Sequence, residues 1–220
     1  MYIDKLHSLT KEISTIQNKY NLNNHSLEIM IVTKQQSNKV VSELIEYKHN
    51  YFGENRVDEL VAKKKLFPSA RFAFIAPIQS RKLAAIMDYS DEIHSISREK
   101  EIQIMSDSSW GGEYFIQVNI DNEPQKSGAE IEKIIELVDF AKKEYRIPNG
   151  LMCIRSLSKE SNPSVSFEKM KELNETIKTI HPEYMSRLSM GMSNDYREAI
   201  IYGSTVVRIG SKIFGLYHVK

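Results

Sequence analysis

The sequence predicts an α/β protein that folds as a single (β/α)8 TIM barrel with an additional N-terminal helix. Two observations support this prediction: strand-like and helix-like segments alternate through all 220 residues, and only a few residues connect them. No linker, low-complexity tract or charge block divides the chain, so residues 1–220 are expected to form one domain. An open doubly wound sheet stays as the alternative, because strand counts from sequence are error-prone.

The elements follow one another in a regular order. Segment 3–20 is expected to be a helix, because its apolar residues recur on one helical face. Short apolar runs predict strands at 27–33, 50–53, 71–75, 92–96, 113–120, 150–154, 187–191 and 205–209. Helical patterns between them lie at 38–48, 56–66, 80–89, 98–105, 128–145, 166–180 and 195–202. Segment 106–112 is expected to be a loop.

Composition excludes several classes of protein. Lys and Arg (30) nearly balance Asp and Glu (29), so no overall field favours nucleic acid or an acidic membrane. No N-terminal signal peptide and no run of ~20 apolar residues is present, so a cytoplasmic protein is expected. The single cysteine, Cys153, lies in an apolar run and is expected to be a buried structural thiol. The histidines have no metal-ligand spacing, so no metal site is expected.

Two basic residues lie where a barrel of this kind binds its ligands, at the C-terminal ends of the strands. Lys34 directly follows the apolar run 29–33. It is either a solvated loop lysine or a partly desolvated amine available for imine formation. Arg208 stands inside the apolar strand 206–209. An arginine there is costly unless it is paired in a salt bridge or faces a polar ligand, and both interpretations stay open.

Small residues follow the seventh and eighth predicted strands, in Ser189-Met-Gly-Met-Ser193 and Arg208-Ile-Gly-Ser211. The loops at these two places are the usual phosphate site of the fold, because small residues let backbone N–H groups approach an anion. Taken singly, Ser193 or Asn194 would be a helix N-cap and Gly210 a turn glycine. Together with the lysine after the first strand, they describe a phosphate site across the barrel mouth from an amine.

A series of short motifs runs in order over residues 27–215. The motifs include Val32-Thr-Lys34, Phe52-Gly-Glu-Asn55, Gln79-Ser80 with Lys82, Gln117-Val-Asn-Ile120, Lys126-Ser-Gly128, Leu188-Ser-Met-Gly-Met-Ser193 and Gly203-Ser-Thr-Val-Val-Arg-Ile-Gly210. In these motifs the sequence resembles the YggS/PROSC pyridoxal-phosphate homeostasis proteins, which share their barrel with the N-terminal domain of alanine racemase. The segments around Ser193 and Arg208 are the most specific part of the resemblance.

The resemblance implies that the cofactor is pyridoxal 5′-phosphate (PLP), held as a Schiff base on Lys34. The implied cofactor-binding residues are Lys34, Asn55, Ser193, Arg208, Gly210 and Ser211. Among them, the two serines and the glycine would hold the phosphate, Arg208 would face the pyridine nitrogen, and Asn55 would lie near the ring. An arginine at that nitrogen keeps it unprotonated, which weakens the ring as an electron sink.

The resemblance also implies a non-catalytic carrier in vitamin B6 homeostasis, with PLP-dependent apo-enzymes as recipients and no catalytic residues. Racemases of this fold draw an opposing tyrosine base from a second domain and a partner subunit. Because the sequence ends at Lys220, we expect neither that domain nor a dimer, but a monomer. A weakly active amino-acid racemase-like enzyme and a barrel that binds another phosphorylated metabolite are the alternatives.

Four residues depart from the family pattern. Ala73 and Ala76 stand in Ala73-Phe-Ile-Ala76, where the family commonly has His-Phe-Ile-Gly. Arg81 replaces an asparagine, and Arg155 occupies a position where proline is usual. These changes leave the lysine and the phosphate residues intact.

Overall fold

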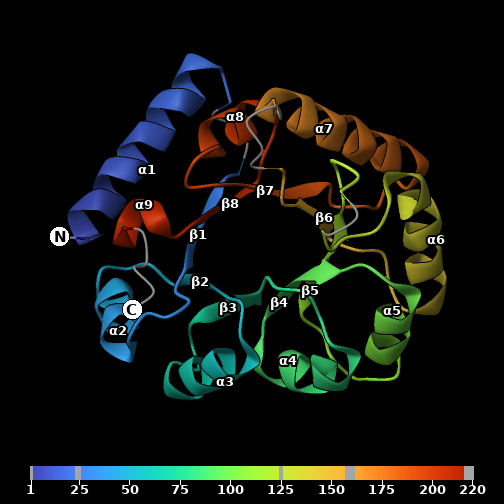
Figure 1. Ribbon diagram of the computed structural model, residues 1–220, viewed down its shortest axis with the longest axis horizontal. Helices are drawn as coiled ribbons and strands as arrows, with labels where there is room; N and C mark the ends of the chain where they lie inside the picture. Colours follow the sequence, from blue (N-terminus) through green and yellow to red (C-terminus); the bar gives the residue numbers. More distant parts are fainter. Residues whose placement is uncertain (1, 23–25, 124–125, 157–161, 216–220) are drawn as a thin grey trace.

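A computed structural model describes residues 2–22, 26–123, 126–156 and 162–215. Its eight strands are all parallel and close into a barrel in chain order, β1 to β8, with helices around the outside (Figure 1). The strands are β1 (Glu28–Val32), β2 (Tyr51–Glu54), β3 (Arg71–Phe74), β4 (Glu92–Ile96), β5 (Glu113–Val118), β6 (Gly150–Cys153), β7 (Arg187–Met192) and β8 (Val206–Ile209). The predicted (β/α)8 barrel is therefore confirmed, and the open sheet is wrong.

The helices occupy the predicted places with a few differences. They are α1 (Tyr2–Lys19), α2 (Asn38–Glu46), α3 (Val57–Leu66), α4 (Leu83–Tyr89), α5 (Glu99–Ser106), α6 (Ile134–Glu144), α7 (Pro163–Ile180), α8 (Tyr196–Ile201) and α9 (Ser211–Phe214), with 3₁₀ turns η1 (Ser80–Lys82) and η2 (Ile131–Lys133). None of the described helices is both long and apolar enough to cross a membrane.

Two predicted helix boundaries were wrong. The helix expected over 128–145 begins only at η2, because Ala129 instead forms a parallel bridge with Val118 at the end of β5. Helix α7 begins three residues before the predicted start, at Pro163. Its N-cap is Asn162, whose side chain accepts a hydrogen bond from the Ser164 N–H, and a proline fits the first helical position.

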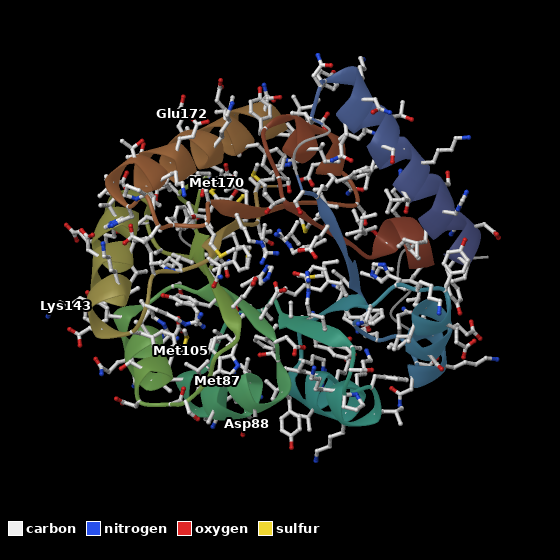
Figure 2. The ribbon with its side chains drawn as sticks, turned by 180° about the vertical axis from the view of Figure 1, so that it is seen from behind. Met87, Asp88, Met105, Lys143, Met170 and Glu172 are labelled. Atoms are coloured by element: carbon white, nitrogen blue, oxygen red, sulfur yellow. The ribbon has the colours of Figure 1, made fainter. Side chains whose placement is uncertain are left out.

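Side chains pack in a ring between the strands and the helices. Figure 2 shows methionines of α4, α5 and α7 on the side of each helix that faces the strands, and charged side chains on the outer rim. The methionines Met87, Met105 and Met170 are buried, and the charged residues Asp88, Lys143 and Glu172 are exposed. This amphipathic arrangement is the reason for the helical periodicity in the sequence.

The N-terminal helix α1 packs against α8 and α9. It lies beside α8 and α9 (Figure 1) and buries Leu6 and Leu9. Its Glu12 accepts a hydrogen bond of 2.6 Å from the Tyr196 hydroxyl and lies 3.3 Å from the Lys212 ammonium. Helix α1 therefore stabilises the positions of α8 and α9.

The inside of the barrel carries charged side chains at its N-terminal end. Four charged residues from alternate strands form a layer there, as inward-pointing side chains do in (β/α)8 barrels. Glu28 of β1 pairs with Arg71 of β3 at 2.6 Å and with Arg187 of β7 at 2.8 Å. Arg187 also pairs with Glu113 of β5. This charged layer closes the end of the barrel opposite the strand ends where ligands are expected.

Candidate functional site

The residues around Lys34 are held in a defined turn at the end of β1. Lys34 is half-buried, and Thr33 before it is fully buried. The Thr33 hydroxyl donates to Oε1 of Glu54 at 2.5 Å, and its carbonyl accepts from the Gln36 N–H at 3.0 Å. Gln35 has a φ of 59°, a left-handed conformation that is uncommon outside glycine. The backbone on both sides of Lys34 is thus fixed.

A buried ion pair stabilises this turn. The Lys63 ammonium of α3 donates to the Thr33 carbonyl at 2.6 Å, to Oε1 of Glu54 at 2.7 Å and to Oε2 of Glu59 at 3.3 Å. Glu59 also accepts from the Gln35 N–H at 2.8 Å. Burial raises the pKa of Glu54, and the neighbouring Lys63 ammonium opposes that rise. Sequence reasoning missed this cluster, although Glu54 lies in the Phe-Gly-Glu-Asn motif.

Asn55 lies at the end of β2, as predicted for a residue at the mouth. It is half-buried, and its Oδ1 is shielded from solvent without a hydrogen-bond partner among the described residues. Asn55 lines a cavity of about 180 Å³ with Gln79 and Lys82 of the next loop. Because buried amide oxygens are normally satisfied, this atom suits a ligand donor.

The loops after β7 and β8 meet at the Ser193 hydroxyl. Its Oγ accepts from the Gly210 N–H at 3.3 Å and from the Lys212 N–H at 3.1 Å. Ser211 lies between these two residues and is half-buried. A Cβ on Gly210 would stand 3.5 Å from the carbonyl oxygen of Val32, so the end of β8 lies beside the end of β1. The structure therefore brings Ser193, Gly210 and Ser211 together next to the strand that precedes Lys34.

The purely structural interpretation of Ser193 or Asn194 as a helix N-cap is wrong. Neither Ser193 nor Asn194 caps α8; the N-cap is Asp195, whose Oδ1 accepts from the Met192 N–H at 2.6 Å. The Ser193 hydroxyl instead satisfies N–H groups at the start of α9. That helix was not predicted, because its four residues are too few to show a periodicity.

Arg208 points into the barrel and is 3% exposed. Its Nη1 donates to the carbonyl and hydroxyl oxygens of Ser189 at 2.6 and 2.8 Å, and its Nη2 donates to the Cys153 carbonyl at 2.7 Å. No carboxylate of the described residues lies within ion-pair distance, so the salt-bridge interpretation is wrong. Burial lowers the pKa of the Arg208 guanidinium. Burial also raises the pKa of the Cys153 thiol to about 12. Cys153 is buried, which confirms the expectation for this residue.

Metal chemistry was not expected from the sequence. Among residues 2–22, 26–123, 126–156 and 162–215, His, Cys, Asp and Glu side chains nowhere gather in a group of three or more that could hold a metal ion.

The comparisons with known proteins cover nearly the whole chain. Residues 5–218 match the family model described as alanine racemase, N-terminal domain. The chain is 32% identical to the pyridoxal phosphate homeostasis protein of Vibrio cholerae over 94% of its length and 92% of the relative's. It is 30% identical to the protein of that name from Escherichia coli K12, over 96% of both chains. The chain belongs to the YggS/PROSC family of pyridoxal phosphate homeostasis proteins.

Solved structures show the same fold. PipY of Synechococcus elongatus without PLP matches with a TM-score of 0.85 at 23% identity, covering 98% of this chain and 100% of that one. Its structure with PLP bound matches with a TM-score of 0.83 over the same shares at 23% identity. Alanine racemase from Corynebacterium glutamicum matches with a TM-score of 0.70 at 14% identity, covering 94% of this chain but 61% of that one.

The departures from the YggS/PROSC pattern have separate structural settings. Ala73 is buried inside the barrel against Met30, Tyr51 and Val206. Ala76 is half-buried at the mouth, and Arg81 is exposed there.

Arg155 has a more consequential setting. Its Nε pairs with Oδ2 of Asp195 at 2.6 Å, and both side chains are nearly buried. Because Asp195 also accepts from the Met192 N–H, Arg155 braces the loop that carries Ser193. A proline at position 155, which is usual in the family, would supply no such ion pair.

Proposed function

We propose that this protein binds pyridoxal 5′-phosphate at the barrel mouth and serves in intracellular vitamin B6 homeostasis, without substantial catalysis. The observation that carries the proposal is the convergence of the Ser193 hydroxyl with the Gly210 and Lys212 N–H groups beside the strand end that presents Lys34. The names of the relatives from Vibrio cholerae and Escherichia coli, and the PLP in one PipY structure, support the same ligand.

The residues at the mouth fit the chemical groups of PLP. A phosphate needs several hydrogen-bond donors, and the backbone N–H groups of Gly210 and Lys212 lie together at the Ser193 hydroxyl, which a phosphate oxygen would replace as their acceptor. An aldehyde needs an amine, which Lys34 provides; condensation forms the C=N bond and releases water. The unpartnered Oδ1 of Asn55 offers an acceptor near the ring.

The position of Arg208 favours a protein that binds the cofactor over an enzyme that uses it in catalysis. An arginine that faces the pyridine nitrogen leaves it unprotonated, so the bound ring stabilises a carbanion poorly. We therefore assign no catalytic residue, and we propose a monomeric single-domain carrier that passes PLP to apo-enzymes. The aldehyde, ring and phosphate of the cofactor would serve only as the groups by which the protein binds it.

Borohydride reduction followed by mass mapping tests the site. Protein loaded with PLP should absorb in the visible, and reduction should fix the adduct on Lys34. Lys34→Ala should abolish both signals, whereas Lys39→Ala, which changes an exposed lysine of α2, should leave them unchanged. An adduct on Lys82 or Lys212, or protein that takes up no PLP, would refute the assignment.

Two further measurements separate the alternatives. Incubation of the loaded protein with L-alanine followed by chiral analysis should reveal no appreciable D-alanine; clear turnover would favour the racemase-like enzyme. Mixing loaded protein with an apo form of a PLP-dependent enzyme should restore that enzyme's activity. Absence of transfer would contradict the carrier role while leaving PLP binding intact.

A further inference from the structure

A continuous chain of hydrogen bonds runs through the barrel interior beneath Arg208. The Arg208 Nη1 donates to the Ser189 hydroxyl at 2.8 Å, and that oxygen lies 2.8 Å from Nδ1 of His94. The His94 Nε2 lies 2.7 Å from Oε2 of Glu92. All four side chains are at most 3% exposed, so solvent competes with none of these contacts.

We propose that Glu92, His94 and Ser189 are positioning residues that orient Arg208 and thereby keep the ring nitrogen of the bound cofactor unprotonated. This inference rests on the proposed function. The chain joins β4, β7 and β8, so it reaches from the charged layer of the barrel up to the ligand mouth. Its members contact Arg208 or one another.

The charges fix the direction of every hydrogen bond. Glu92 also accepts from the Tyr51 hydroxyl at 2.7 Å and pairs with Arg71 at 3.0 Å, which favours an ionised carboxylate. An ionised carboxylate only accepts, so the Nε2 of His94 must donate to it. A neutral His94 then accepts at Nδ1 from the Ser189 hydroxyl, whose oxygen accepts from Arg208. Arg208 thus donates to Ser189, Ser189 donates to His94, and His94 donates to Glu92.

The surroundings of His94 support its neutral form. Burial lowers the pKa of His94, while Glu92 on its own strand acts in the opposite direction. Arg187 of β7 and Arg208 of β8 lower it further by repulsion, and the ring of Phe115 on β5 packs at a centroid distance of 4.0 Å. A second proton at Nδ1 would aim a cationic donor at an oxygen that already accepts from Arg208.

The chain also explains how Arg208 is tolerated in the interior. A buried guanidinium with no carboxylate partner is costly, and two carbonyl acceptors compensate only part of that cost. The hydrogen-bonded chain links Arg208 to the Glu92 carboxylate through two intermediates. Such networks polarise their members, so removing one link should loosen Arg208 itself.

The first test uses the unloaded protein and needs no cofactor. Nitrogen NMR should show His94 neutral with its proton on Nε2 at pH ~7. Glu92→Gln should move part of the population to the Nδ1–H tautomer, because an amide can donate where the carboxylate could only accept. Ser189→Ala should speed the rotation of the Arg208 guanidinium about its Cζ–Nε bond. A doubly protonated His94, or unchanged rotation, would overturn the proposal.

The second test uses protein loaded with PLP labelled with ¹⁵N in the ring. Ser189→Ala should shift the ring nitrogen toward its protonated signal and speed PLP release by about tenfold, as expected for a lost hydrogen bond to a charged group. Ser189→Thr keeps the hydroxyl and should restore both values to within about twofold of the unmodified protein.

Ser204→Ala is the matched control. Ser204, just before β8, is also buried (2% exposed, against 0% for Ser189), but its hydroxyl donates to the Met190 carbonyl of β7 and lies outside the hydrogen-bonded chain. Identical spectra and release rates for Ser189→Ala and Ser204→Ala would refute the positioning role. Protein that binds no PLP would refute the proposed function instead, and the rotation of Arg208 in the unloaded protein would then decide the inference alone.

Discussion

The ammonium of Lys63 lies 2.6 Å from the backbone carbonyl of Thr33, the residue directly before Lys34. A lysine from one helix thus fixes the backbone that presents another lysine to the barrel mouth. The exposed fraction of the Lys63 side chain is 3%, and that of its partner Glu54 is 0%. Breaking a buried pair by removing one partner leaves a charge without compensation.

Lys63→Met should therefore destabilise the protein by about 3–5 kcal/mol, because Glu54 would stay buried without its partner. Urea unfolding measures this change in the free energy of unfolding. The matched control is Lys65→Met, two residues along the same helix and exposed, which should change stability by no more than about 0.5 kcal/mol. Equal unfolding midpoints for the two variants would contradict the structural role of Lys63.

Ser193→Ala should weaken PLP binding while leaving the fold intact. A hydrogen bond to a charged group contributes about 1.5–3 kcal/mol, so the Kd should rise by roughly 10- to 150-fold. Equilibrium titration with PLP measures the change, and Ser14→Ala on the exposed face of α1 serves as the control. Unaltered affinity in Ser193→Ala would move the phosphate site away from this loop.

Arg155→Met should destabilise the loop that carries Ser193, because Asp195 loses its buried partner. We expect a loss of about 3 kcal/mol in unfolding free energy and faster PLP release. Adding Asp195→Asn to Arg155→Met should recover part of the loss, since the two residues are coupled in a double-mutant cycle. Arg81→Met, which removes an exposed arginine at the mouth, should have little effect. Strict additivity in the cycle would rule out the coupling.

Acid should destabilise the protein through Glu92. Burial raises the pKa of this carboxyl, but the donors His94, Arg71 and Tyr51 outweigh it and lower the pKa from 4.5 to about 2. A lowered folded-state pKa gives stability that is present above the unfolded value of 4.5 and lost as pH falls toward 2. The contribution is roughly 3 kcal/mol when fully lost.

Urea unfolding between pH 5 and about pH 2.5 checks this window. Glu92→Gln should flatten the loss of stability with acid, whereas Glu99→Gln, an exposed residue of α5, should preserve it. A profile in Glu92→Gln as steep as in the unmodified protein would assign the acid sensitivity to other carboxylates.

The positions of several proposed site residues could be predicted because the fold itself places them. Alternation of strands and helices predicts a barrel, and a barrel fixes which residues reach the mouth. Lys34, Asn55 and Ser193 follow from that rule, since each stands just beyond a strand. The partners of Arg208 could not be predicted, because two of its acceptors are backbone carbonyls that any residue would offer.

The clusters around Lys63 and His94 could not be predicted from the sequence either. Lys63 begins the run Lys63-Lys64-Lys65, which has the appearance of a solvated helix face. The His94 and Ser189 side chains that meet inside the barrel are separated by 95 residues. Local pattern carries no information on such a pairing; it depends on strand register and on the closure of the barrel.

The pairing of β1 with β8, and of α1 with α8 and α9, bears on how the protein is made. Glu12 and Tyr196 are 184 residues apart in the chain, and their contact must await almost complete synthesis on the ribosome. A nascent chain holds Lys34 long before it holds Ser193 or Arg208. If PLP is held, as proposed, by Lys34 together with the loops after β7 and β8, it would stabilise only the completed barrel, and its binding would mark the completion of folding.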